Sequence, residues 1–135
     1  MRYKRVVSLF CAVICMMTMV VSASARASDQ IRSYLIQVES NDRNIYVDFS
    51  VIGNGGMDRI GCESIYIYDR SNGDLVDSFD ENDTGMSRSN TVRYANMITA
   101  DCEVGTSYRV EVTIFAEDSA GRDTRSQTFF VTGQA

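Results

Sequence analysis

The sequence predicts an all-β domain, and three observations support this fold class. From about residue 30 onward, apolar and polar residues alternate in short runs, as on strands with one buried face. Clusters rich in Gly, Asn, Asp and Ser separate these runs and favour turns. No stretch has a convincing helical period and no internal repeat is present. Regular short strands with turns between them predict an antiparallel sandwich or barrel of seven strands.

The seven expected strands follow from alternation and from the turns that bound them. They cover residues 31–39, 44–53, 60–68, 75–79, 91–98, 108–117 and 124–132. The clearest alternation is in the second strand, where apolar residues at 45, 47, 49 and 51 share one face. Asn54-Gly55-Gly56 is expected to end that strand, because glycine readily adopts the positive φ of a turn. Asn72-Gly73 predicts a hairpin after the third strand.

The third strand can be read in two ways, because both of its faces are apolar or aromatic. If Ile65 and Ile67 fill the core, Tyr66 and Tyr68 stand on the outer face together with Tyr46 of the neighbouring strand. Exposed tyrosines are typical of binding surfaces, so these three residues form the candidate binding face. The opposite parity would bury the tyrosines and expose the isoleucines.

The first 25 residues have the pattern of a secretory signal peptide. A basic start with Arg2, Lys4 and Arg5 precedes an apolar run over residues 6–21. Small residues follow and offer cleavage after residue 25, with a second site after residue 27. The apolar run is shorter than the roughly 18 residues that favour a spanning helix, which argues against the alternative of a retained membrane anchor. We expect a secreted or cell-surface protein with a single domain over residues 26–135 and no membrane insertion after cleavage.

The charge of the expected mature chain argues against polyanionic partners. The whole sequence has 13 basic and 18 acidic residues, a net charge of −5. Three basic residues leave with the signal peptide, so the remainder carries a net charge of −8. An acidic domain repels phosphate groups and anionic membrane surfaces. We therefore expect no nucleic acid partner.

The cysteines predict one disulfide bond. Cys11 and Cys15 lie within the signal peptide, which leaves Cys62 and Cys102 in the mature chain. An even pair of cysteines in an exported chain usually forms a disulfide. Two free thiols are the alternative.

The residue types present exclude several kinds of catalysis and leave one weak metal candidate. The sequence has no histidine, and its only lysine is Lys4, so His-dependent triads and Schiff-base chemistry are excluded from the mature domain. We expect no enzyme and no cofactor. An acidic stretch at and after the end of the fourth strand offers oxygen ligands of the type that calcium prefers, although a solvated loop between strands is the simpler explanation. Its candidate ligands are Asp77, Asp80, Glu81 and Asp83.

Two stretches resemble the fibronectin type III and related immunoglobulin-like domains. The run 104–112, Val-Gly-Thr-Ser-Tyr-Arg-Val-Glu-Val, is similar to that family's approach to its sixth strand, and residues 64–68 resemble its tyrosine-rich third strand. The resemblance implies a seven-stranded Greek-key β-sandwich in which Tyr108 is the corner tyrosine, its hydroxyl bonded to upstream backbone. It also implies that Cys62 and Cys102 tie one end of the sandwich. The chain departs from the family in having no tryptophan and no proline.

These features predict a non-catalytic recognition or adhesion module that binds protein or carbohydrate outside the cell. A fold of this class hosts many functions, so the expectation rests on the export signal and on the absence of catalytic residue types. The alternative is a structural subunit of a surface assembly that pairs through exposed strand edges. A small secreted hydrolase or inhibitor is a third, weaker alternative.

Overall fold

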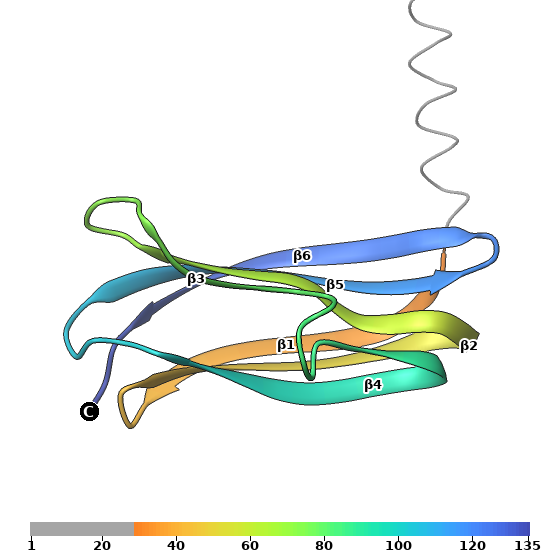
Figure 1. Cartoon of the computed structure of the whole chain (residues 1–135), viewed down its shortest axis with the longest axis horizontal. Coiled ribbons are helices and arrows are strands. Elements are labelled where there is room, and N and C mark those ends of the chain that lie inside the picture. Colours follow the sequence, from red (N-terminus) through yellow and green to blue (C-terminus); the bar gives the residue numbers. More distant parts are fainter. Residues whose placement is uncertain (1–28) are drawn as a thin grey trace, which may run out of the picture.

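The computed structural model describes residues 29–135 and shows an all-β chain of six strands (Figure 1). Their bounds are β1 Ile31–Asn41, β2 Asn44–Asp69, β3 Leu75–Asp80, β4 Ser87–Asp101, β5 Ser107–Asp118 and β6 Gly121–Thr132. Every strand pairing is antiparallel. None of the residues in this range forms a helix long and apolar enough to cross a membrane. The signal peptide expected over residues 1–25 lies outside the described residues.

The expected count of seven strands is wrong, because the second and third expected strands are one continuous strand, β2. Its first half pairs with β1 on one side and β4 on the other. Its second half pairs with β5 and β3 and, over Met57–Gly61, with the start of β4. Strand β6 then pairs with β5. Figure 1 shows β3, β5 and β6 in one layer and β1 and β4 in a second layer, with β2 contributing to both. The arrangement is compatible with a β-sandwich.

The bend that carries β2 between the layers lies where the sequence predicted a strand end. Gly55 has a φ of 108°, and the register against β4 shifts between Ile52 and Met57. The backbone N–H of Asn54 donates a hydrogen bond to the carbonyl of Gln30 at 2.8 Å, which ties the bend to the chain before β1. The glycines therefore bend the strand without ending it, as they do at β-bulges and corners.

The core lies between the layers and is built from the inward residues of both. The parity of the third segment is settled, since Ile65 and Ile67 are fully buried whereas Tyr66 is 40% exposed. Each fully buried aliphatic or aromatic side chain contributes about 1.5–3 kcal/mol of hydrophobic stabilisation. The largest fully buried side chains include Ile45, Val47, Phe49, Val51, Ile60, Ile65, Ile67, Met86, Val110, Val112 and Ile114.

Tyr108 anchors the connection between β4 and β5. Its ring is buried, and its Oη accepts a hydrogen bond from the backbone N–H of Glu103 at 2.8 Å. This is the upstream backbone contact that a corner tyrosine is expected to make. It holds the loop before β5 against the end of the molecule that also carries the last residues of the chain, where Gly105 N–H bonds to the Gly133 carbonyl at 2.9 Å.

The expected disulfide is wrong, because Cys62 and Cys102 are both free. Cys62 is in register with Ile114, near the end of β5, whereas Cys102 precedes the start of β5 at Ser107. Along β5, Ser107 and Ile114 are seven residues apart, and at about 3.3 Å per residue this places the two cysteines more than about 20 Å apart. A disulfide requires Cα atoms within about 7 Å of each other. Because β2 and β5 are antiparallel, Cys62 in the second half of β2 lies beside the end of β5. Cys102 precedes the start of β5, so the two cysteines lie at opposite ends of this strand.

Candidate functional site

The outer face of the β3–β2–β5–β6 layer carries the most distinctive group of surface residues. Tyr66 is in register with Glu111 of β5, and Tyr68 with Arg109, which in turn is in register with Phe130 of β6. Their neighbours Ile67 and Val110 are buried, and side chains alternate along a strand, so these residues point outward. We call the group Tyr66, Tyr68, Arg70, Arg109 and Phe130 the aromatic face.

Two aromatic side chains of the aromatic face are exposed, and a third is half-buried beside them. Phe130 is 59% exposed and Tyr66 is 40% exposed. The rings of Tyr66 and Tyr68 are neighbours, with centroids 6.5 Å apart and planes tilted by 37°. Exposed aromatic side chains that gather on one rigid sheet provide a large contact area at a small cost in conformational entropy.

Two arginines lie over rings of the aromatic face. The guanidinium carbon of Arg109 is 4.4 Å from the centroid of Tyr68, and that of Arg70 is 4.5 Å from the centroid of Phe130. Each contact is worth about 0.5–1 kcal/mol at an exposed site. Arg109 Nε also lies 3.4 Å from Glu111 Oε1, an ion pair without hydrogen-bond geometry. The stacking holds both guanidinium groups against rings of the outer face.

Uncharged hydroxyl side chains extend the outer face beyond the rings. Thr113 and Ser126 lie opposite each other, and their hydroxyl oxygens are 2.8 Å apart. Thr128 is in register with Glu111 on the same face, and Ser78 of β3 is in register with Tyr66. Hydroxyl side chains thus lie beside the aromatic face on the same side of the sheet.

Tyr46 does not belong to this surface, although the sequence grouped it with Tyr66 and Tyr68. It is in register with Glu39 of β1 and Thr99 of β4, in the other layer. Between Tyr46 and Tyr66 the strand β2 passes from one layer to the other, so the outward faces of its two halves lie on opposite sides. Tyr46 instead borders a shallow open groove of about 380 Å³, lined by Ile36, Gln37, Val38, Glu39, Tyr46, Asp48, Met97 and Phe129.

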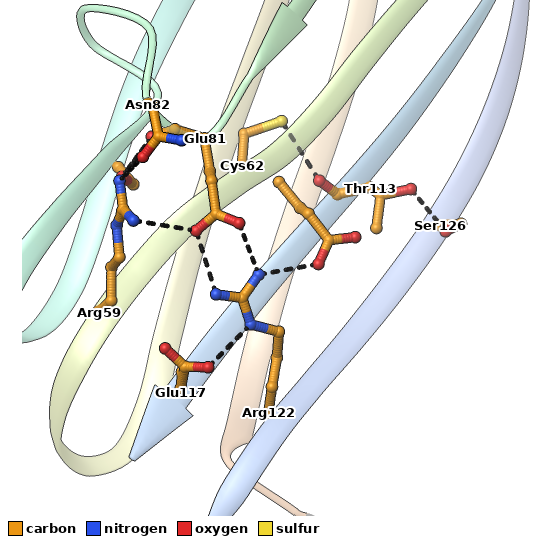
Figure 2. A network of polar contacts seen from close by, with 10 residues as sticks. Arg59, Cys62, Glu81, Asn82, Thr113, Glu117, Arg122 and Ser126 are labelled. Carbon is orange, nitrogen blue, oxygen red and sulfur yellow. Dashed lines mark hydrogen bonds and ion pairs between the residues drawn. The ribbon is translucent and has the colours of Figure 1, made fainter.

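A charged network lies at the other end of the same outer face (Figure 2). Arg122 Nη1 contacts both Glu63 Oε1 and Glu81 Oε1 at 2.9 Å, and its Nε contacts Glu117 Oε1 at 3.1 Å. Arg59 Nη1 approaches Glu81 from the other side at 3.2 Å. The hydrogen bonds from Arg122 lower the pKa of Glu81 below its ordinary value, and those carboxylates raise the pKa of Arg122. The network fastens the loop between β3 and β4 to strands β5 and β6.

The carboxylates of the calcium candidates contact arginines or nearby backbone N–H groups. Glu81 faces the two arginines, Asp80 Oδ1 accepts the N–H of Asn82 at 2.8 Å, and Asp83 Oδ2 accepts the N–H of Asp80 at 2.8 Å. Asp77 Oδ1 accepts the N–H of Ser78 at 2.9 Å. Across residues 29–135, no three His, Cys, Asp or Glu side chains are grouped so as to hold a metal ion. The loop geometry therefore gives no support to a calcium site.

Arg122 also covers an apolar residue that sequence reasoning missed. Phe115 points outward from β5, opposite Thr124 and Gly61, yet it is fully buried. The guanidinium carbon of Arg122 lies 4.2 Å from the centroid of its ring. The signal was present in the sequence, because Ile114, Phe115 and Ala116 interrupt the alternation of β5 with three consecutive apolar residues.

The two free cysteines have different environments. Cys62 is fully buried, its Sγ lies 3.3 Å from the carbonyl oxygen of Thr113, and burial raises its pKa to about 12. A thiol with so high a pKa is a poor nucleophile at neutral pH. Cys102 is half-buried, with its Sγ 3.6 Å from Ser40 Oγ.

No protein-family model matches the chain, and no curated protein sequence matches it.

Proposed function

We propose that this protein is a non-catalytic recognition module of the fibronectin type III-like kind, secreted or displayed at the cell surface. The signal-like pattern of residues 1–25 supports export, and the contact between Tyr108 and Glu103 supports the family resemblance. The aromatic face is its binding surface. A protein partner is favoured, and a carbohydrate is the second candidate.

The observation that carries this proposal is the pairing of exposed rings with stacked arginines on one rigid sheet. Tyr66 and Phe130 are exposed, and Arg109 and Arg70 lie over Tyr68 and Phe130. Tyrosine and arginine are enriched at the centres of protein interfaces and carry much of their binding energy. The rings supply apolar contact area, and the guanidinium groups donate hydrogen bonds to carboxylate or carbonyl oxygens of a partner.

The shape and chemistry of the aromatic face favour binding to a surface over catalysis on a small molecule. The face is an open sheet surface, whereas sites for small molecules are concave and bury most of the ligand. Its functional groups are aromatic rings, guanidinium groups and hydroxyls. Its nearest carboxylate, Glu111, is ion-paired with Arg109 at 3.4 Å.

The experiment that tests this function is a binding screen with matched variants. The protein is applied to an array of purified cell-surface proteins and to an array of glycans. We expect Tyr66→Ala and Phe130→Ala each to weaken the selected interaction at least about tenfold, which is the loss at an interface hot spot. Tyr46→Ala, in the opposite layer, is the control and should leave affinity unchanged.

The outcomes of the screen separate the alternatives. Loss of binding confined to the aromatic-face variants supports the proposal, and a ligand found only on the glycan array selects the carbohydrate form. Equal loss from Tyr46→Ala, or unchanged affinity in Tyr66→Ala and Phe130→Ala, would place the binding surface elsewhere and overturn the proposal.

A further inference from the structure

Four strands of the described chain have an edge that no other described strand pairs with, namely β1, β3, β4 and β6. An unpaired edge presents a row of backbone N–H and C=O groups and readily adds another strand. Proteins commonly blunt such edges with bulges, short strands and charged side chains. The four edges differ in how far they are blunted.

Three of the four edges carry these protections. The pairing of β1 with β2 has a register shift between Ile31 and Ser33. Strand β3 is only six residues long, carries Asp77 near its centre and has a register shift of its own. In β4, Asn90 has a φ of 55°, Arg93 is exposed and the register against β2 is interrupted. The uninterrupted runs of the two longer strands, Ser33–Asn41 in β1 and Arg93–Asp101 in β4, are shorter than the run of β6, which pairs with β5 from Gly121 to Thr132.

Strand β6 lacks these protections over most of its length. It pairs with β5 from Gly121 to Thr132 without a register shift. Its segment 126–132, Ser-Gln-Thr-Phe-Phe-Val-Thr, has no charge, and Arg125 is engaged by Asp123 of the same strand. Gln127 is exposed although it lies on the inward side of β6, opposite the buried Val112. Ser126, Gln127 and Thr128 are all exposed, so the middle of this strand is accessible to solvent.

The hydroxyl contact between Thr113 and Ser126 shows which backbone groups of β6 are free. Their oxygens are 2.8 Å apart, the close approach that is typical of a non-hydrogen-bonded antiparallel pair. In such a pair the N–H and C=O groups of each residue point away from the neighbouring strand. The free edge is therefore formed by Ser126 and by every second residue from it, including Thr124, Thr128 and Phe130.

The geometry points to a homodimer in which the β6 strands of two copies pair antiparallel around a two-fold axis at Gln127. Residue 127 is the midpoint of 122–132, so this register is the one that uses the whole regular edge. Ser126 then lies opposite Thr128 of the second copy, and both direct their free backbone groups at each other. Arg125 lies opposite Phe129 of the second copy, and no like charges face each other along the interface.

A second copy is the favoured occupant because this edge is self-complementary. An isologous two-fold contact needs a surface that matches itself, and a long uncharged antiparallel strand does so with every backbone group paired. The joined sheet would run from β3 of one copy to β3 of the other. Its two-fold axis is perpendicular to the sheet, so both aromatic faces lie on the same side. The dimer itself does not depend on the proposed function, but it would make that function bivalent.

The test uses opposite charges at the axis, because Gln127 meets its own copy there. We expect the full-length protein to be dimeric by sedimentation velocity. Gln127→Lys and Gln127→Glu should each be monomeric, since two like charges would then face each other, and an equimolar mixture of the two variants should restore a mixed dimer. Gln37→Lys and Gln37→Glu, at an exposed glutamine of β1, are the controls and should remain dimeric.

A second variant removes a hydrogen bond at the free edge while it spares the pairing with β5. Ser126→Pro deletes an N–H that points away from β5, a position where an edge strand tolerates proline. It removes two interface hydrogen bonds per dimer, so we expect the dissociation constant to rise at least about tenfold. An unchanged circular dichroism spectrum would show that the variant is folded.

Other outcomes overturn the dimer. They are a monomeric wild-type protein at the highest accessible concentration, single Gln127 variants that remain dimeric, or a mixture of the two that stays monomeric. A monomer that binds its partner through Tyr66 and Phe130 would leave the proposed function standing without the dimer. A dimer that binds no partner on either array would leave the dimer standing and count against the proposed function.

Discussion

The hydroxyl of Tyr108 accepts a hydrogen bond from the backbone N–H of Glu103 at 2.8 Å, across a loop of four residues. The ring is buried at the head of β5, so this one contact fixes the chain that leads into the central strand of its layer. Tyr108→Phe keeps the ring and removes the acceptor. We expect it to lower the free energy of unfolding by about 1 kcal/mol in urea denaturation.

The control for this prediction is Tyr66→Phe, which removes a hydroxyl on the exposed outer face. That hydroxyl makes no hydrogen bond to another described residue, so its loss should change stability by less than about 0.5 kcal/mol. Equal effects of the two variants would show that the bond to Glu103 does not stabilise the corner.

Gly61 is a position where only glycine fits. Its φ is 152°, and a Cβ atom there would overlap the carbonyl oxygen of Met86. That carbonyl is held in place because it accepts the N–H of Cys62 at 2.7 Å. We expect Gly61→Ala to cost at least about 3 kcal/mol in thermal or urea unfolding.

Gly56→Ala is the matched control for Gly61→Ala, because both glycines lie in β2 and nothing lies within 4 Å of a Cβ atom at Gly56. We expect its stability to stay within about 0.5 kcal/mol of the wild type. A tolerated Gly61→Ala would mean that the loop before β4 can move away from β2.

Acid should weaken the attachment of the loop between β3 and β4. Hydrogen bonds from Arg122 hold the pKa of Glu81 below its ordinary value of 4.5. A carboxylate with a lowered pKa in the folded state contributes stability that is fully present above pH 4.5 and is lost as the pH falls through the lower folded-state pKa. Glu81→Gln should therefore be less stable than the wild type at neutral pH, by about 1 kcal/mol or less for a partly solvated network.

The measurement is the urea midpoint of both proteins from neutral to acidic pH. The difference between wild type and Glu81→Gln should shrink as the pH falls below 4.5. Glu39→Gln is the control, since Glu39 is exposed on β1 and forms no ion pair with any described residue. A pH-independent difference would show that Glu81 stabilises the loop by packing alone.

The two cysteines of the fold should differ in reactivity. Burial raises the pKa of Cys62 to about 12, so alkylation of the native protein near neutral pH should label Cys102 and spare Cys62. In urea both should react. Peptide mapping by mass spectrometry assigns the labels, and recovery of a peptide cross-linked between Cys62 and Cys102 would contradict the free thiols of the structure.

Alternation predicted the strands well, because it reports directly which side chains face the core. The expected segments 44–53 and 60–68 both lie within β2, and Ile45, Phe49 and Ile65 are buried. Alternation does not show whether a glycine ends a strand or bends it. At Asn54-Gly55-Gly56 the same residues that often end a strand bend this one, because β1, β4 and β5 supply partners on either side of the bend.

The candidate site was only partly predictable, because a face depends on which layer a strand belongs to. Tyr66 and Tyr68 share the expected outward parity, but the passage of β2 between layers separates them from Tyr46. Arg70 follows β2 and Phe130 lies in β6, so their contact leaves no local pattern in the sequence. The disulfide prediction was wrong for a related reason. Cys62 and Cys102 were each expected near the start of a strand, but the starts of two antiparallel strands lie at opposite ends of the pair.

The continuity of β2 through both layers has a consequence for how the domain opens. Its 26 residues pair with β1, β3, β4 and β5, so neither layer can detach as an independent unit while the other keeps all its hydrogen bonds. Amide protons in the two halves of β2 should therefore exchange with solvent through the same rare global event and report one free energy. Slow exchange at Val47 with fast exchange at Ile67 would show instead that the bend at Gly55 acts as a boundary between two foldons.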